Sequence, residues 1–307
     1  MKKIAFMFPG QGSQYVGMGR EIMKEFPNAA RLMERAKAVL EMDIEKLCFA
    51  GPAKELNNTR NTQPAIYIVS MMINRVLSEK GIEPAVVAGH SLGEYSALAA
   101  AGVFSFEDGL RLVRQRGILM DEALPGGQGI MAAVIGLDPE QILSICQQVG
   151  GICEVANYNS PQQIVISGEV AATREAMKLA DESGARRVVE LDVSGPFHSS
   201  LMRPAREKLV GIIKEIDFKE PSVPVIANTT ANYVKDVEGI KEALINQLTS
   251  SVRWVESINL MVKDGVNTFI EVGPGRVLKS LLRKINRSVK AYNVEDIKSL
   301  NQLLKEL

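Results

Sequence analysis

Three short apolar runs in this chain each end in a glycine-rich loop, and this pattern constrains the fold more than any other feature. The runs are residues 4–8, 85–88 and 268–272, and the loops after them begin at Pro9, Gly89 and Gly273. A short, continuous apolar run is typical of a strand that is buried on both faces. We therefore expect a parallel sheet with helices against both of its sides.

Longer segments with helical periodicity separate these runs. They cover residues 63–80, 92–101, 106–122 and 203–215, and a fourth strand is expected at residues 223–227. Strands that alternate with helices indicate an α/β protein with a parallel sheet. A length of 307 residues, of which 46% are hydrophobic and 23% charged, fits about two domains or one large α/β domain with an insertion.

The middle of the chain follows a different order. Strands are expected at residues 129–135, 153–156, 163–168 and 186–191, with helices at 139–149 and 172–183. This βαββαβ order is that of a ferredoxin-like unit. Pro125-Gly126-Gly127 precedes the unit and Gly195-Pro196 follows it, so we expect a core of residues 1–125 and 196–307 with an inserted subdomain at 126–195.

One loop carries a pattern associated with catalysis. Gly89-His90-Ser91-Leu92-Gly93 is a G-x-S-x-G motif that follows an expected strand and opens an expected helix. In that context the two glycines allow a sharp turn that exposes the serine hydroxyl above a helix N-terminus, which is the geometry of a nucleophile elbow. The alternative is a purely structural turn, because the five-residue pattern alone is common.

A serine nucleophile needs a base, and this chain has only two histidines, His90 and His198. His90 is adjacent to Ser91 on a tight turn, where neighbouring side chains diverge, so we interpret it as a structural residue that supports the elbow. By elimination His198 is the candidate base, against the alternative of a satisfied structural histidine. The residues do not reveal which group orients it. The long segment after His198 also departs from the α/β-hydrolase order, in which the histidine lies near the C-terminus.

An arginine lies on the apolar side of the helix expected at residues 106–122, which Ser105 caps. Leu112, Val113, Leu119 and Met120 surround Arg116 at helical spacing, and none of the positions three or four residues away is acidic. A guanidinium in that position either reaches water or binds an anion from elsewhere, because burial of an unpaired charge is costly.

Charge and cysteine content narrow the function classes. Lys plus Arg and Asp plus Glu both total 36, which argues against nucleic-acid or membrane-surface partners. The three cysteines include no CxxC pair, which favours a reducing compartment over a zinc site or a disulfide framework.

The apolar run at residues 4–8 is too short for a signal peptide and no run could span a membrane, so we expect a cytoplasmic protein. We also expect it to be a monomer. Tyr15 replaces the third glycine of a dinucleotide-binding motif, and no Gly-Lys of a P-loop is present, which argues against nucleotide-driven chemistry.

Taken together, the motifs resemble those of the malonyl-CoA:acyl carrier protein transacylase family of fatty-acid synthesis, which is related to the acyltransferase domains of polyketide synthases. The matching segments, in the family's order and spacing, are Phe8-Pro9-Gly10-Gln11-Gly12-Ser13-Gln14, Thr62-Gln63-Pro64-Ala65, Gly89-His90-Ser91-Leu92-Gly93-Glu94, Arg116-Gly117, Gly195-Pro196-Phe197-His198-Ser199, Gln247 and Glu271-Val272-Gly273-Pro274-Gly275.

The resemblance implies an α/β-hydrolase-like core with a ferredoxin-like insertion, and it assigns roles to residues. It implies that Ser91 is acylated, that His198 is its base, and that the main-chain carbonyl of Gln247 orients His198. It further implies that the main-chain amides of Gln11 and Leu92 form the oxyanion hole. By the same resemblance, Arg116 binds the malonyl carboxylate, and Phe197 before the histidine favours malonyl over methylmalonyl.

The implied reaction is a ping-pong transfer from malonyl-CoA, through malonyl-Ser91, to the phosphopantetheine thiol of acyl carrier protein, without a metal or redox cofactor. Because carrier protein is acidic, a set of basic residues could form its dock, against the alternative of a solvated face: Arg186, Arg187, Lys279, Arg283, Lys284 and Arg287. The rival functions are a trans-acting polyketide acyltransferase, an acyl-editing serine thioesterase and a non-catalytic partner of a synthase.

Overall fold

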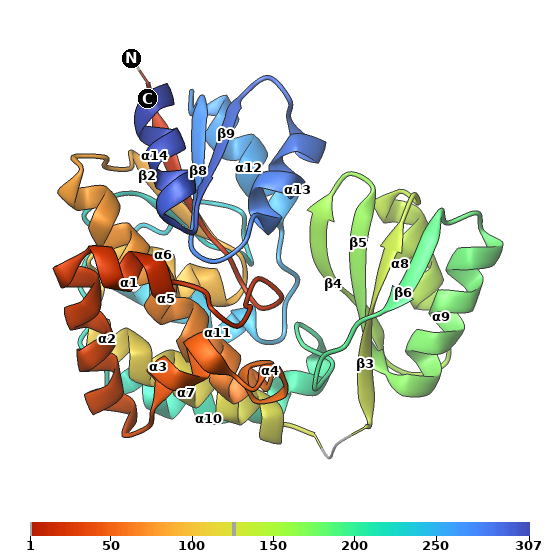
Figure 1. Cartoon of the computed structure of the whole chain (residues 1–307). Helices are drawn as coiled ribbons and strands as arrows, with labels where there is room; N and C mark the ends of the chain where they lie inside the picture. Colours follow the sequence, from red (N-terminus) through yellow and green to blue (C-terminus); the bar gives the residue numbers. More distant parts are fainter. Residues whose placement is uncertain (1, 125–126) are drawn as a thin grey trace.

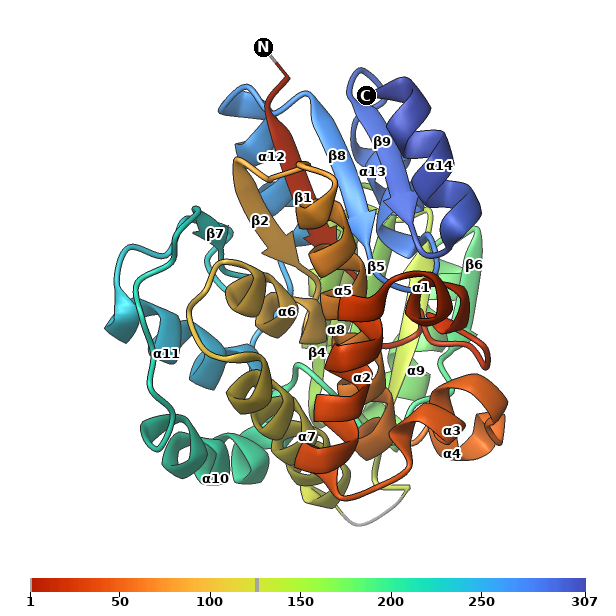
Figure 2. The same cartoon turned by 60° about the vertical axis from the view of Figure 1, so that its left-hand side comes forward.

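The computed structural model describes residues 2–124 and 127–307. Its larger sheet has five strands in the order β7-β2-β1-β8-β9, and every neighbouring pair is parallel. Figure 2 shows these strands side by side in that order. The strands are β1 (Ile4–Phe8), β2 (Val86–Gly89), β7 (Val225–Ile226), β8 (Thr268–Val272) and β9 (Lys290–Val294). The predicted parallel sheet is confirmed.

Both faces of this sheet are buried, as the continuous apolar runs predict. Alternate residues of β1 point to opposite sides, so Phe6 and Phe8 join one hydrophobic cluster and Ala5 and Met7 join another. The first cluster extends into the helices α2 (Pro27–Leu40), α5 (Thr59–Glu79), α6 (Leu92–Ala100) and α7 (Phe106–Glu122). The second is closed by α12 (Trp254–Lys263) and α13 (Val277–Ile285) around the fully buried Trp254. The strands β1, β2, β7 and β8 are therefore almost wholly buried, whereas the edge strand β9 is partly exposed.

The helices of this part of the chain are α1 (Arg20–Glu25), α2 (Pro27–Leu40), α3 (Ile44–Ala50), α4 (Ala53–Leu56), α5 (Thr59–Glu79), α6 (Leu92–Ala100), α7 (Phe106–Glu122), α10 (Arg203–Lys214), α11 (Val237–Gln247), α12 (Trp254–Lys263), α13 (Val277–Ile285) and α14 (Ile297–Glu306). Sequence reasoning missed α1 to α4, although Pro27 at the first turn of α2 and Asp43 as the cap of α3 mark two of their starts. It also missed β9.

The smaller sheet is antiparallel and has the order β4-β5-β3-β6. Its elements follow one another as β3 (Gly129–Ile135), α8 (Pro139–Gln148), β4 (Cys153–Ser160), β5 (Gln163–Glu169), α9 (Val170–Glu182) and β6 (Arg187–Glu190), which confirms the expected βαββαβ order. This part lies beside the larger one in Figure 1. We propose residue 195 as its end; the boundary expected at 125 and 126 lies outside the described residues.

The expected start of one helix was wrong. The pattern predicted a helix from residue 63, before Pro64, but α5 begins four residues earlier and contains the proline. Proline lacks the N–H that would bond to the carbonyl of Arg60. The Arg114 side chain on α7 donates to that carbonyl instead, so a tertiary contact satisfies the group that proline leaves free.

The described residues include no helix with both the length and the apolar character needed to cross a bilayer. All three cysteines are buried as free thiols. Cys146 and Cys153 lie close together in the smaller part, with 3.7 Å between their sulfur atoms.

Two glycines that both lie in helices provide a test of how closely α6 packs on the sheet. A Cβ atom on Gly93 in α6 would lie 1.9 Å from the carbonyl oxygen of Phe8, whereas one on Gly211 in α10 would meet nothing within 4 Å. We expect Gly93→Ala to lower the free energy of unfolding by at least about 2 kcal/mol, because β1 and α6 must separate. Gly211→Ala should instead raise it by about 0.5–1 kcal/mol through helix propensity. Urea denaturation measures both values, and equal effects would contradict the close packing.

Candidate functional site

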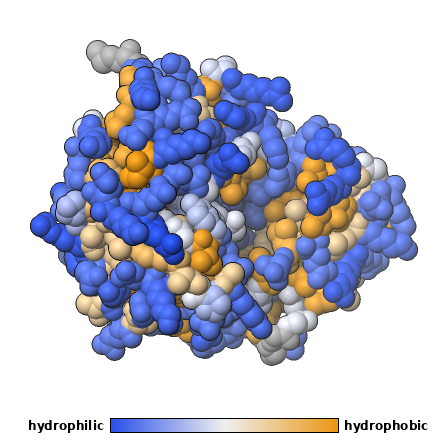
Figure 3. Space-filling model, in the orientation of Figure 1, coloured by the Kyte–Doolittle hydropathy of each residue, from blue (hydrophilic) through white to orange (hydrophobic). Residues whose placement is uncertain are grey.

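A cavity of about 340 Å³ lies where the two parts of the chain meet. The space-filling view shows a hollow in this region (Figure 3). Its lining residues are Gln11, Gly12, Gln14, Asn57, Gln63, His90, Ser91, Leu92, Arg116, Met120, Met131, Asn157, Leu191, Asp192, Val193, Phe197 and His198. The loops after β1 and β2 reach it at the carboxyl ends of neighbouring parallel strands, where open α/β sheets usually bind ligands.

Ser91 occupies the sharp turn between β2 and α6 that the motif predicts. Its φ of 51° and ψ of −107° are rare for a residue with a side chain, and both glycines of the motif permit a close approach. A Cβ atom on Gly89 would lie 1.9 Å from the backbone of Gly93. The side chain of Asn228, beyond the end of β7, holds the turn: its Oδ1 accepts from the Ser91 N–H at 2.7 Å, and its Nδ2 donates to the Gly89 carbonyl at 2.6 Å.

His198 lies against Ser91 although 107 residues separate them, with 2.8 Å between Nε2 and the serine Oγ. Its Nδ1 faces the carbonyl oxygens of Gln247 at 2.9 Å and Ser250 at 3.2 Å. Because a carbonyl can only accept, Nδ1 carries the proton, so Nε2 is left to accept the hydroxyl hydrogen of Ser91. Sequence reasoning named the Gln247 carbonyl through resemblance and missed that of Ser250.

Burial and charge keep His198 neutral. The side chain is buried, and desolvation, followed by the positive charge of Arg116, lowers its pKa from 6.5 to about 3. The bond to the Gln247 carbonyl opposes this decrease only in part. At neutral pH the imidazole is therefore in the form that can accept a proton.

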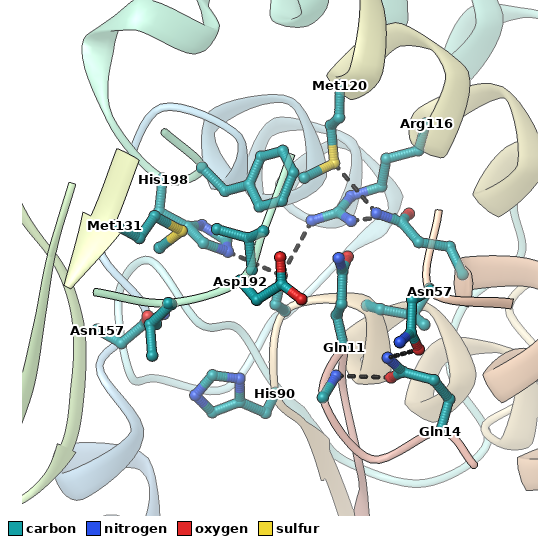
Figure 4. Close-up of a pocket in the computed structure, with 17 residues that line it drawn as sticks. Gln11, Gln14, Asn57, His90, Arg116, Met120, Met131, Asn157, Asp192 and His198 are labelled. Atoms are coloured by element: carbon teal, nitrogen blue, oxygen red, sulfur yellow. Dashed lines mark hydrogen bonds between the residues drawn. The ribbon is translucent and has the colours of Figure 1, made fainter. Parts of the chain in front are cut away.

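His90 lines the same cavity but makes a different contact. Its Nε2 lies 2.7 Å from Oδ1 of Asn159, and its ring packs edge-on against Trp254. Figure 4 shows His90 set apart from His198, on the other side of the cavity. Only one of the two histidines is thus hydrogen-bonded to Ser91.

Arg116 is fully buried and points from α7 into the cavity (Figure 4). One terminal nitrogen, Nη1, donates to Oε1 of Gln63 at 2.9 Å. The other, Nη2, donates to Oε1 of Gln247 at 2.8 Å and to Oγ of Ser91 at 3.1 Å. All three acceptors are neutral, so in the described part of the chain no carboxylate is hydrogen-bonded to this guanidinium.

The main-chain amides of Gln11 and Leu92 both belong to residues that line the cavity. Leu92 begins α6, where N–H groups lack partners within the helix and the helix dipole favours negative charge. Among the described residues neither of these two N–H groups has a hydrogen-bond partner. Their role as an oxyanion hole stays a prediction.

Three functional neighbours were not singled out from the sequence as site residues. Asn228 follows an expected strand, as polar site residues often do in parallel sheets, and Glu94 lies in the first turn after the serine. Gln63 occurs in one of the segments that resemble the family, but the resemblance implied no role for its side chain. In the part of the chain that the structure describes, no group of three or more His, Cys, Asp or Glu side chains could hold a metal ion.

The structure brings basic residues from both parts toward one end of the smaller sheet. Lys284 on α13 donates to the side chain of Gln163 on β5 at 3.0 Å. Ile135 on β3 pairs with Gln163 on one side and with Arg187 on β6 on the other, so Lys284 and Arg187 lie at the same end of the smaller sheet. Arg283 and Arg287 line a groove with Lys284. Docking of a carrier protein on this surface stays a prediction.

A family model described as "Acyl transferase domain" matches residues 5–306. A malonyl CoA-acyl carrier protein transacylase of Bacillus subtilis is 48% identical over an alignment of 312 positions, which covers 100% of this chain and 98% of the relative.

Solved structures give the same result. A malonyl-transacylase in complex with a type II PKS acyl-carrier protein has a TM-score of 0.97 and 42% identity, with 100% of both chains covered. An acyl-carrier-protein-S-malonyltransferase from Bartonella henselae has a TM-score of 0.96 and 43% identity, with 99% of each chain covered. The fold predicted from the sequence agrees with that of these proteins.

The low pKa of His198 can be tested with a neutral serine reagent such as a sulfonyl fluoride, which makes no use of Arg116 as an anion site. An ordinary histidine would lose its base form below about pH 6.5. Because the pKa of His198 is lowered to about 3, we expect the labelling rate of Ser91 to stay nearly constant from about pH 8 to about pH 5. A decrease centred near pH 6.5 would contradict this. Ser91→Ala serves as the control for labelling elsewhere.

Proposed function

We propose that this chain, which belongs to the acyl transferase family that includes the malonyl CoA-acyl carrier protein transacylases, transfers a malonyl group from malonyl-CoA to the thiol of an acyl carrier protein. The observation that carries the proposal is the contact between a buried arginine and the candidate nucleophile. Arg116 donates to Oγ of Ser91 and has no carboxylate hydrogen-bonded to it in the described residues. An acyl group with its own carboxylate would complete this site.

In the first half-reaction, Oγ of Ser91 attacks the thioester carbon of malonyl-CoA. His198 accepts the hydroxyl proton at Nε2 as the carbon–oxygen bond forms. The amides of Gln11 and Leu92 donate to the oxyanion, and loss of one such donor typically costs about 3–4 kcal/mol in the transition state. The carbon–sulfur bond then breaks, and His198 returns the proton to the sulfur atom of coenzyme A.

In the second half-reaction, the phosphopantetheine thiol of carrier protein attacks the malonyl ester. His198 takes the thiol proton and delivers it to Oγ of Ser91 as the ester bond breaks. The bond from Nδ1 to the Gln247 carbonyl keeps Nε2 facing Ser91 in both steps and stabilises the transient imidazolium. A carbonyl serves here in place of the carboxylate of a triad.

Arg116 gives the reaction its acyl selectivity. A guanidinium donates two parallel hydrogen bonds to a carboxylate, and this pairing is strongest where water is excluded. An acetyl group would bring no partner for the buried charge, so it should react far more slowly. Phe197 also lines the cavity, and by resemblance to the family it favours malonyl over methylmalonyl.

An acyl-editing thioesterase would use the same serine and histidine but pass the acyl group to water. Transfer to a thiol is favoured by the relatives, one of which is in complex with an acyl-carrier protein. We propose that the reaction takes place in the cytoplasm and supplies fatty-acid synthesis. A trans-acting role with a polyketide carrier is the second candidate, since that complex contains a type II PKS carrier.

The decisive experiment follows the acyl group. Protein incubated with malonyl-CoA should gain a malonyl adduct on Ser91, detected by peptide mass spectrometry, and holo carrier protein should then remove it as malonyl-carrier. Ser91→Ala should show no adduct. Rapid release of free malonate without transfer would favour the thioesterase, and the absence of any adduct would exclude the proposal.

The role of Arg116 is tested by its replacement with alanine. We expect Arg116→Ala to lower kcat/KM for malonyl-CoA by at least about a hundredfold, because a charge-assisted pair is lost, and to change acylation by acetyl-CoA far less. Single-turnover acylation of Ser91 measures both rates. Equal losses for the two substrates would show that Arg116 supports the site in another way.

A further inference from the structure

Gln247 connects the two halves of the site. Its main-chain carbonyl accepts from His198, and its side-chain Oε1 accepts from Arg116. The other end of the side-chain amide, Nε2, donates to Glu94 at 2.6 Å and to the Ser91 carbonyl at 3.0 Å. The guanidinium is therefore presented with an oxygen only as long as this amide keeps its orientation.

Two acceptors fix that orientation, the Ser91 carbonyl and the Glu94 carboxylate, and of the two only Glu94 can change its protonation state. It lies on the first turn of α6, is 2% exposed, and has no part in the steps described above. One carboxylate oxygen accepts from Nε2 of Gln247 and from the main-chain N–H of Asn228 at 3.1 Å. A carboxylate offers only acceptors, so it selects the end of the amide that donates.

We propose that ionised Glu94 is a positioning residue for malonyl selectivity: it orients the Gln247 amide so that Oε1 holds Arg116 in place for the malonyl carboxylate. This inference rests on the proposed function. If Glu94 carried a proton, it could donate to Oε1 of Gln247, and the amide would then turn its N–H groups toward the guanidinium. Two donors would face each other, and Arg116 would lose one of its three acceptors.

The surroundings of Glu94 leave the carboxylate poised for such a change. Burial raises its pKa to about 7, while the bonds from Gln247 and Asn228 and the charge of Arg116 on α7 oppose the increase. Tyr95 on the same helix is the other titratable neighbour, and burial raises its pKa to about 12, so it stays neutral. Asn228 and Gln247 carry no charge, and His198 lies beyond Gln247.

The test compares acylation of Ser91 by malonyl-CoA and by acetyl-CoA in Glu94→Gln, a change that keeps the side-chain size. We expect the malonyl rate to fall by about tenfold, the scale of one charge-assisted hydrogen bond, because a neutral amide can face Gln247 with either end. The acetyl rate and labelling by a neutral sulfonyl fluoride should change by no more than about twofold, since neither uses the malonyl carboxylate.

Glu271 offers a matched control. It is also a buried glutamate whose pKa burial raises to about 7, but it accepts from the main-chain N–H groups of Leu278 and Lys279 at the start of α13, outside the cavity. Glu271→Gln should leave the ratio of malonyl to acetyl rates unchanged. Equal losses for both acyl groups in Glu94→Gln, or no loss for malonyl, would overturn the proposal, whereas failure of the proposed function would abolish the malonyl adduct in the wild-type chain as well.

The wild-type chain provides a second measurement that remains available if Glu94→Gln does not fold. Since the ionised form is required, the ratio of malonyl to acetyl rates should be highest above about pH 7 and decrease as the pH falls through that value. In the free protein the pKa of His198 is lowered to about 3, so its protonation lies outside this pH range when both rates are measured as kcat/KM. A ratio that stays constant from about pH 8 to about pH 5.5 would overturn the proposal.

Discussion

The burial of one positive charge without a carboxylate hydrogen-bonded to it governs the arrangement of this site. Arg116 is fully buried among apolar residues of α7, and its hydrogen-bond acceptors in the described residues are two amide oxygens and one hydroxyl. Such burial costs several kcal/mol, which neutral acceptors offset only partly. In the proposed function an anionic acyl group completes this site, and the three acceptors hold the guanidinium beside the serine.

The backbone of the elbow is the second constraint, and it depends on the sheet. Ser91 has a positive φ, and α6 starts so close to β1 that Gly93 has no room for a Cβ atom. Asn228 closes the turn from β7, on the far side of β2. Three parallel strands thus contribute to the position of one hydroxyl, which lies at the junction of β2 and α6 and not on a long loop.

Much of this could be predicted from the sequence because the signals are local. The continuous apolar runs indicated a sheet buried on both sides, and the glycines around Ser91 indicated the elbow. The start of α5 could not be predicted, since the interaction that tolerates Pro64 comes from Arg114 on another helix. The pairing of Ser91 with His198 followed from the scarcity of histidines and from the family resemblance. Asn228 and the Ser250 carbonyl reach the site through tertiary packing. The position of Asn228 after an expected strand is a weak signal for it, whereas no local pattern marks Ser250.

The charge of Arg116 also connects recognition with reactivity. Besides desolvation, that charge lowers the pKa of His198 in the free protein. In the proposed reaction, the malonyl carboxylate cancels much of the charge, so one cause of the low pKa disappears when the correct acyl group binds. The imidazole then becomes a stronger base at the moment when Ser91 must lose its proton. An acetyl group would leave the charge in place and His198 weak, so the same guanidinium would discriminate twice, once in binding and once in proton transfer.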